Sequence, residues 1–254
     1  MLLFISCAKT MTERHPRVTL PFTTLPYFES EARANAMEMN QFSADDLGKL
    51  LHINTKLAAE NYLRYQNFFS PDTPSLPALL AYTGMVFKHI NGSSFTLDDF
   101  TYAQEHLLIT SFLYGLLRPL DLIHSYRLEG NVCLPKHDCT MFDYWKPILT
   151  SWFIEAIRKQ GGILVNLASA EMKDLFHWER ITEAVHVITP DFLVQKEGKL
   201  KSITVYAKMC RGEMTRFLLK NRIEAPEQIK TFKWEGFTYR PEASTPNHPV
   251  FVLE

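Results

Sequence analysis

Residues 2–10 read LLFISCAKT and join a short apolar run to a polar carboxyl end. The run from Leu2 to Ser6 suits a strand that is buried on both faces, which is typical of a sheet covered by helices. The AKT segment places Lys9 just beyond this strand, at the end where functional groups gather in open sheets. These residues therefore favour a helix-covered sheet with a candidate site at its edge.

Several segments farther along the chain have the caps and apolar spacing of helices. Ser43 begins a long helix with apolar positions as far as Ala58, and Thr96 caps another helix. Further helices are expected over 78–90 and over 141–159, and Gly161-Gly162 ends the second of these. Helices therefore dominate the first two thirds of the chain.

Strand patterns occur mainly in the last third of the chain. Ile163 to Leu167 predicts a second doubly buried strand. A meander of strands near 185–188, 192–195 and 200–206, a helix over 208–222, and strands at 236–239 and 250–253 are expected to follow. The fold class is therefore mixed α/β (α+β): a single domain over 1–254, with a mixed twisted sheet surrounded by helices and a late antiparallel meander.

Composition excludes several broad classes of protein. The chain has 254 residues and a formal net charge of −1, so the molecule as a whole does not attract nucleic acid or a membrane surface. No apolar run approaches the roughly 20 residues that span a bilayer. Cysteines at 7, 133, 139 and 210 are too scattered for a disulfide framework. We expect a cytoplasmic monomer without a membrane partner.

The segment at 114–129, YGLLRPLDLIHSYRLE, places arginines and carboxylates within an otherwise apolar run. Pro119 lacks an amide hydrogen and disfavours helical geometry at the residue before it. A helix through 113–117 is therefore expected to end at Arg118.

Each arginine of this segment has an acidic residue close behind it in the sequence. The pairs Arg118–Asp121 and Arg127–Glu129 are either ion pairs that fix a turn or parts of a ligand site. Both interpretations stay open at this point.

The strongest local charge lies between Lys196 and Arg222, a segment with eight basic residues and only two acidic ones, Glu197 and Glu213. A helical wheel places four residues on one face: Lys208, Arg211, Thr215 and Arg222. This face is either a solvated surface or a phosphate site, in which arginine matches phosphate oxygens and Thr215 adds a neutral donor. Residues 223–226 then lead into a short second helix, a geometry that can grip a DNA backbone, although glycines usual in such a hairpin are absent.

Evidence for metal ligands and enzyme motifs is weak. Cys133, His137 and Cys139 are close in sequence but lack a fourth ligand at zinc-site spacing, so we expect no metal and no cofactor. The common phosphate-loop, nucleophile-elbow and zinc-protease motifs are absent. We assign no catalytic residue and favour a non-enzymatic protein.

An enzyme remains the alternative, because polar residues recur at the ends of predicted elements. It would act on a nucleotide or damaged nucleic acid. Its site would be assembled from Ser6, Lys9, Arg118, Asp121, Asn166, Ser169 and Glu171. Asn166 and Ser169 have a simpler interpretation, in which they cap the helix that follows them.

Six motifs together resemble the YaaA peroxide-stress protein family, from the first residue almost to the last. They are SCAKT at 6–10, LYGLLRPLDL at 113–122, YRLE at 126–129, NLAS at 166–169, YAK with RG within 206–212, and RFLLKNRIEAPEQI at 216–229. The resemblance implies a cytoplasmic bacterial protein that helps cells survive hydrogen peroxide by limiting free iron and the damage that iron does to DNA.

The resemblance also implies double-stranded DNA as the partner, bound through a basic cleft with a helix-hairpin-helix element on a mixed α/β fold. Matching positions give Lys9, Arg118, Arg127, Lys208, Arg211 and Arg216 as candidate DNA-binding residues, and the helical wheel adds Thr215 and Arg222. Such contacts to the backbone carry little base specificity.

The chain departs from the family pattern at several polar positions. The family usually has proline at Cys7, a K-G-D pattern at Thr83-Gly84-Met85, aspartate at Ala170 and a second lysine at Met209. These differences imply weaker DNA binding, loss of an activity or a different ligand.

Overall fold

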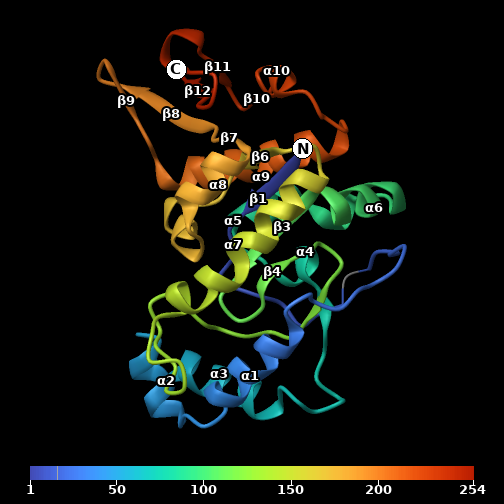
Figure 1. Cartoon of the computed structure of the whole chain (residues 1–254), viewed down its shortest axis with the longest axis vertical. Coiled ribbons are helices and arrows are strands. Elements are labelled where there is room, and N and C mark those ends of the chain that lie inside the picture. Colours follow the sequence, from blue (N-terminus) through green and yellow to red (C-terminus); the bar gives the residue numbers. More distant parts are fainter. Residues whose placement is uncertain (16) are drawn as a thin grey trace.

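The computed structural model describes residues 1–15 and 17–254, and these form two five-stranded sheets and one two-stranded sheet (Figure 1). The first sheet has the order β4-β3-β1-β6-β7. Its strands are β1 (Leu2–Ile5), β3 (Leu107–Ser111), β4 (Gly115–Leu117), β6 (Ile163–Asn166) and β7 (His186–Ile188). All neighbours are parallel except the edge pair β3 and β4. The four residues of β1 are buried, as a doubly covered central strand requires.

The chain crosses this sheet in both directions around β1. It passes from β1 to β3 through α6 (Leu97–His106), then across to β6 through α7 (Met141–Lys159), and on to β7 through η2 (Ala170–Leu175) and α8 (Trp178–Ala184). In Figure 1, α7 lies in front of the sheet. The change of direction makes β1 a topological switch point, where a crevice opens beyond the carboxyl ends of the strands.

The second sheet, at the top of Figure 1, has the order β10-β11-β12-β8-β9. Its strands are β8 (Asp191–Lys196), β9 (Lys199–Lys201), β10 (Lys233–Trp234), β11 (Phe237–Tyr239) and β12 (Val250–Leu253). β12 pairs in parallel with β8, and the other neighbours are antiparallel. One hydrophobic core includes side chains from both large sheets, such as Phe4 and Phe251.

The remaining elements cover the sheets or connect them. Near the bottom of Figure 1 lie α1 (Glu29–Met39), α2 (Ala44–Leu50) and α3 (Thr55–Asn67). The others are β2 (Leu76–Pro77), α4 (Ala78–Ala81), α5 (Met85–Ile90), η1 (Gly92–Ser94), β5 (Leu122–Ile123), α9 (Thr204–Lys220), α10 (Pro226–Ile229) and η3 (Pro241–Ala243). Helices α5 and α9 pack closely against each other.

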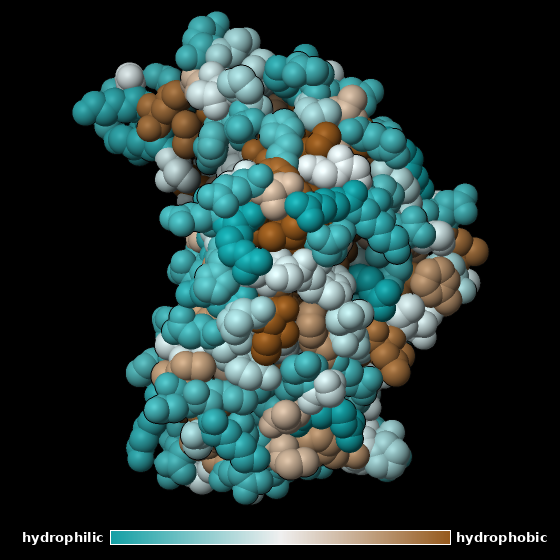
Figure 2. All heavy atoms as spheres, viewed as in Figure 1, coloured by the Kyte–Doolittle hydropathy of each residue, from teal (hydrophilic) through white to brown (hydrophobic). Residues whose placement is uncertain are grey.

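The surface in view is mainly polar. On the face shown in Figure 2, hydrophobic residues form small separate patches among hydrophilic ones. Within the described residues, no helix combines the length and hydrophobicity needed to cross a bilayer.

The mixed α/β class is confirmed, with mixed sheets surrounded by helices. The helix over 141–159 has the predicted bounds. Thr96 caps α6 in a reciprocal capping box with Asp99. The strand at 250–253 also has its predicted bounds.

The prediction of a helix through 113–117 is wrong. That segment turns from β3 into β4, and Gly115 makes the turn at a φ of +71° beside the Trp145 ring. Both strands are buried on all sides, so an apolar run there carries no strand periodicity. Arg118 therefore follows a strand and does not end a helix.

Other predicted elements were too long or placed in the wrong sheet. The helix from Ser43 breaks between α2 and α3, where His52 has a φ of +50°, and the helix over 78–90 breaks between α4 and α5. The strand over 200–206 ends at Lys201, because α9 begins at Thr204. The strand near 185–188 is β7, which pairs with β6 and lies outside the late meander.

Candidate functional site

Segments that are far apart in the sequence meet in a pocket of about 380 Å³ beyond the carboxyl ends of the first sheet. We call it the strand-end pocket. It is lined by Ser6 to Thr10 after β1, Phe112 after β3, Arg127 to Asn131, the segment around Ser169 after β6, the first turns of α5, Phe142 of α7, and Lys208 and Arg211 of α9. The pocket thus occupies the switch-point crevice that the sheet order creates.

Glu129 joins two of the predicted cations at one side of the pocket. Its carboxylate accepts from Lys9 Nζ at 2.6 Å and from an Arg127 terminal nitrogen at 2.8 Å. Burial disfavours the charged carboxylate, but these two hydrogen bonds outweigh it and lower the pKa of Glu129. Of the two interpretations left open for Arg127 and Glu129, the ion pair is present, and Glu129 also brings Lys9 to the same place.

Arg127 also carries a buried polar atom with no partner. Its Nε donor makes no hydrogen bond in the described structure, and the side chain is 15% exposed. A buried donor without an acceptor costs about 1–3 kcal/mol. An acceptor oxygen from a ligand would remove that cost.

Hydroxyl groups connect the ends of β1 and β6. The Ser6 and Ser169 hydroxyl oxygens lie 3.1 Å apart, and the Ser169 amide donates to Ser6 Oγ at 2.8 Å. Ser169 Oγ then donates to Glu171 at 3.2 Å. Ser169 occupies the N-cap position of η2, as expected, but its side chain makes no capping hydrogen bond there. Asn166 Oδ1 instead accepts from the Ala168 amide and shapes the turn.

Helix α9 reaches the pocket because Gly212 allows it to approach α5. A Cβ at Gly212 would lie 2.3 Å from the Val86 carbonyl oxygen, which is too close for any other residue. His89 Nδ1 and Glu213 Oε1, 2.9 Å apart, join the same two helices. This close packing presents Lys208 and Arg211 to the pocket.

Lys208 and Arg211 differ from three other cations of this region, which are held in ion pairs. Neither makes an ion pair within residues 1–15 and 17–254, whereas Lys201, Lys220 and Arg222 each do. Partial burial lowers the pKa of Arg211, which nevertheless stays cationic at neutral pH. Their charges are thus available for an anion at the pocket.

Arg118 lies outside the pocket. It forms a two-pronged ion pair with Asp121, at 2.8 Å for the shortest contact, and also donates to the Leu25 carbonyl oxygen. Asp121 is 1% exposed and accepts from the Thr24 hydroxyl at 2.6 Å. The turn-fixing interpretation of this pair is the one that the contacts match.

Two more candidates, Thr215 and Arg216 of α9, make contacts within the protein. Thr215 is fully buried, and its hydroxyl donates to the Arg211 carbonyl oxygen. Arg216 donates to the Ile90 carbonyl oxygen at 3.0 Å and to Ser94 Oγ at 2.8 Å.

Arg222 lies beyond the end of α9, at a φ of +52°. It pairs with Asp99 at 3.1 Å and stacks over the Tyr102 ring. Lys220 donates to the same carboxylate at 2.6 Å. Burial opposes ionisation of Asp99, but the bonds from Lys220 and Thr96 lower its pKa to about 2.

The predicted site residues therefore divide into two groups. Lys9, Arg127, Lys208 and Arg211 meet at the strand-end pocket, together with Ser6, Ser169 and Glu171 of the alternative enzyme site. Arg118, Asp121, Asn166, Thr215, Arg216 and Arg222 do not line it.

Sequence reasoning missed the apolar side of the pocket. Phe112, Tyr126 and Phe142 line it, but nothing in their local sequence separates them from ordinary core residues. Gly84 is the residue whose identity could have pointed to this part of the pocket. A Cβ at Gly84 would lie 2.6 Å from the Ala8 Cβ, so the residue is a close contact between α5 and the segment after β1.

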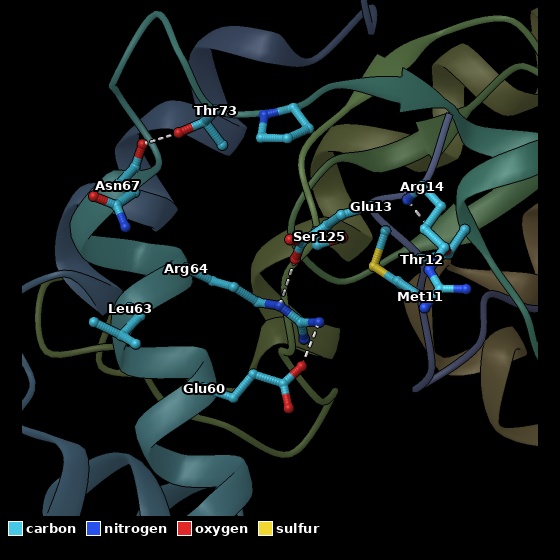
Figure 3. Close-up of a pocket in the computed structure, with 11 residues that line it drawn as sticks. Met11, Thr12, Glu13, Arg14, Glu60, Leu63, Arg64, Asn67, Thr73 and Ser125 are labelled. Carbon is cyan, nitrogen blue, oxygen red and sulfur yellow. Dashed lines mark hydrogen bonds and ion pairs between the residues drawn. The ribbon is translucent and has the colours of Figure 1, made fainter. Parts of the chain in front are cut away.

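A second cavity, of about 590 Å³, lies beside α3 (Figure 3). Arg64 points into it and pairs with Glu13 at 3.1 Å and with Glu60 at 2.6 Å. These acidic partners compensate the arginine charge. Among the described residues, no group of three or more potential metal ligands comes together.

Comparisons with known proteins identify the family to which these pocket motifs belong. Residues 1–243 match the family described as "Peroxide stress protein YaaA". A UPF0246 protein of Phocaeicola vulgatus is 59% identical over 254 residues, which cover 100% of this chain and 99% of the relative. A UPF0246 protein of Bacteroides fragilis is 57% identical over 99% of this chain and 98% of its own length, and one of Clostridium botulinum is 37% identical over the whole of both. The chain belongs to the YaaA family of peroxide stress proteins, which supports a role in the response to peroxide stress.

Proposed function

We propose that this protein acts in the cytoplasm and binds the backbone of double-stranded DNA at the strand-end pocket, which helps to limit iron-dependent damage to that DNA. One observation carries the proposal: Lys9, Arg127, Lys208 and Arg211 come from distant segments and converge on one pocket. Their convergence creates a cationic site in a chain whose net charge is only −1.

The charges at the pocket favour a phosphate group. Four cations there outnumber the two carboxylates, Glu129 and Glu171. Lys208 and Arg211 need no internal bond to break before they bind an anion. The unpartnered Nε donor of Arg127 would also gain an acceptor.

Protection against iron would follow from the same contacts. Lysine and arginine side chains that bind phosphates displace the cations condensed around DNA. Ferrous iron is one such cation, and the radicals that it forms from peroxide act near the place where they arise. The protein would then protect the DNA segment that it covers without holding iron itself.

Titration of a labelled duplex at two salt concentrations tests this function. We expect the wild type to bind at low salt and to bind much more weakly at high salt. The double variant Lys208→Glu with Arg211→Glu, which reverses both charges, should not bind the duplex at low salt. Lys56→Glu, an exposed lysine on α3, is the matched control and should have little effect. The absence of binding by the wild type, or equal binding by the double variant, would defeat the proposal.

An enzyme that acts on a nucleotide or on damaged nucleic acid is the second candidate. The chain of hydrogen bonds through Ser6, Ser169 and Glu171 favours it, because a carboxylate that accepts from a hydroxyl can serve as a general base. Incubation of nucleotides and of oxidised duplexes with the wild type and with Ser169→Ala tests this function. Turnover lost in the variant would support catalysis, and unchanged substrates with the wild type would rule it out for the compounds used.

A further inference from the structure

The strand-end pocket has a buried apolar floor in addition to its cations. Phe112, Tyr126 and Met172 line the pocket and are exposed by 7%, 5% and 4%. Lys9 and Lys208 are exposed and can meet a phosphate on the outside of a duplex, whereas these three side chains are buried. Backbone binding alone therefore gives the apolar floor nothing to contact.

We propose, resting on the function proposed above, that the strand-end pocket binds one unpaired nucleoside monophosphate unit. Its phosphate lies at Lys208 and Arg211, and its base lies against the Phe142 ring and the apolar floor. The unit is either a nucleotide extruded from duplex DNA or a free nucleotide. Both sources have the same chemistry, a planar base joined through a sugar to a phosphate.

The size and the aromatic walls of the pocket fit this ligand. Its volume of about 380 Å³ falls in the range of small-molecule sites, about 300–1,000 Å³. Phe142 is partly exposed, and its ring stands edge-on to Phe112 with the centroids 5.2 Å apart. Aromatic rings of this kind accept any base by stacking, whereas a phosphate alone would gain nothing from them.

Gly130 leaves room for the Phe142 ring beside the pocket. A Cβ at Gly130 would lie 2.2 Å from Phe142 Cε2 and 2.8 Å from Phe112 Cε1. Gly130 follows directly on Arg127 to Glu129, so the segment that supplies the Arg127 cation also makes room for the ring. The same pocket is lined by the hydroxyls of Ser6 and Ser169 and by the Glu171 carboxylate, which can pair with the polar edge of a base or sugar.

Two measurements on the full chain test the inference and separate the two sources. Calorimetric titration compares deoxyadenosine monophosphate with inorganic phosphate, and we expect the nucleotide to bind at least tenfold more tightly. Phe142→Leu keeps an apolar side chain but removes the ring, and it should reduce this preference about tenfold. Phe69→Leu, an aromatic substitution outside the pocket, is the control. The second measurement uses a duplex with 2-aminopurine, whose fluorescence rises when the base leaves the stack.

The outcomes are distinct. Nucleotide preference together with a fluorescence rise assigns the pocket to an extruded nucleotide, and preference without a rise assigns it to a free nucleotide. Equal binding of nucleotide and phosphate, with no fluorescence rise, overturns the inference even if the duplex still binds. Nucleotide preference in a protein that fails to bind any duplex overturns the proposed function and leaves the inference standing.

Discussion

Replacement of Gly212 by alanine tests how the basic face of α9 reaches the pocket. An exposed helical glycine replaced by alanine normally stabilises a protein by up to about 1 kcal/mol. Here the new Cβ would lie 2.3 Å from the Val86 carbonyl oxygen and 2.7 Å from the His89 Cβ. Because helix backbone cannot turn aside as a side chain can, α9 must move away, at the cost of about 1–3 kcal/mol for an overpacked core. The opposing terms leave a net loss of stability of about 1 kcal/mol.

Urea unfolding followed by circular dichroism measures this change, and Gly48→Ala is its matched control. Gly48 is also a helical glycine, but its Cβ would lie 3.5 Å from the nearest atom, the Ala58 Cβ, which is ordinary contact. We expect the control to be neutral or more stable, and Gly212→Ala to be less stable and to bind DNA more weakly, since Lys208 and Arg211 move with α9. Stabilisation by Gly212→Ala would refute the reasoning.

Three further substitutions have expected outcomes. Asp121→Ala should lower the free energy of unfolding by about 2 kcal/mol, because the Thr24 hydroxyl and the Arg118 amide lose their acceptor, while the folded variant binds DNA like the wild type; loss of binding in folded protein would restore Arg118 to the site. The pKa of Asp99 is about 2 in the folded state and about 3.9 in the unfolded state, so its ionised form stabilises the wild type by about 2 kcal/mol above pH 4. The wild type loses this stabilisation as the pH falls towards 2, and Asp99→Asn should lack it at every pH. Identical pH profiles of unfolding for the two proteins would contradict this. Glu129→Gln should raise duplex affinity severalfold in anisotropy titrations, because Glu129 competes with phosphate for Lys9 and Arg127, and weaker binding would show instead that the carboxylate holds them in place.

Sequence patterns predicted the elements whose apolar residues have a clear period or a clear end. Helix α7 carries apolar residues at helical spacing and ends before Gly161-Gly162, and β1 and β6 are short apolar runs of strand length. The turn from β3 to β4 was mistaken for helix, because an uninterrupted buried run has neither the period of a helix nor that of a strand.

The site was predictable where it depends on the end of one element, and not where it depends on long-range packing. Lys9 lies shortly after the end of β1, and the carboxyl ends of the strands are where sites form in open sheets. The helical wheel grouped Thr215 with Lys208 and Arg211, because it gives angles around α9 but not the direction from which α5 covers the helix. It also extended to Arg222, although α9 ends at Lys220.

The salt dependence of duplex binding tests the central claim most directly, since it counts the phosphates that the pocket engages. The logarithm of the binding constant falls with the logarithm of the salt concentration, with a slope of about −0.9 for each phosphate neutralised. The double variant Lys208→Gln with Arg211→Gln should therefore have a shallower slope than the wild type, by about 1 if both side chains hold one phosphate and by about 2 if each holds its own. An unchanged slope would place the DNA contacts elsewhere on the molecule and contradict the account.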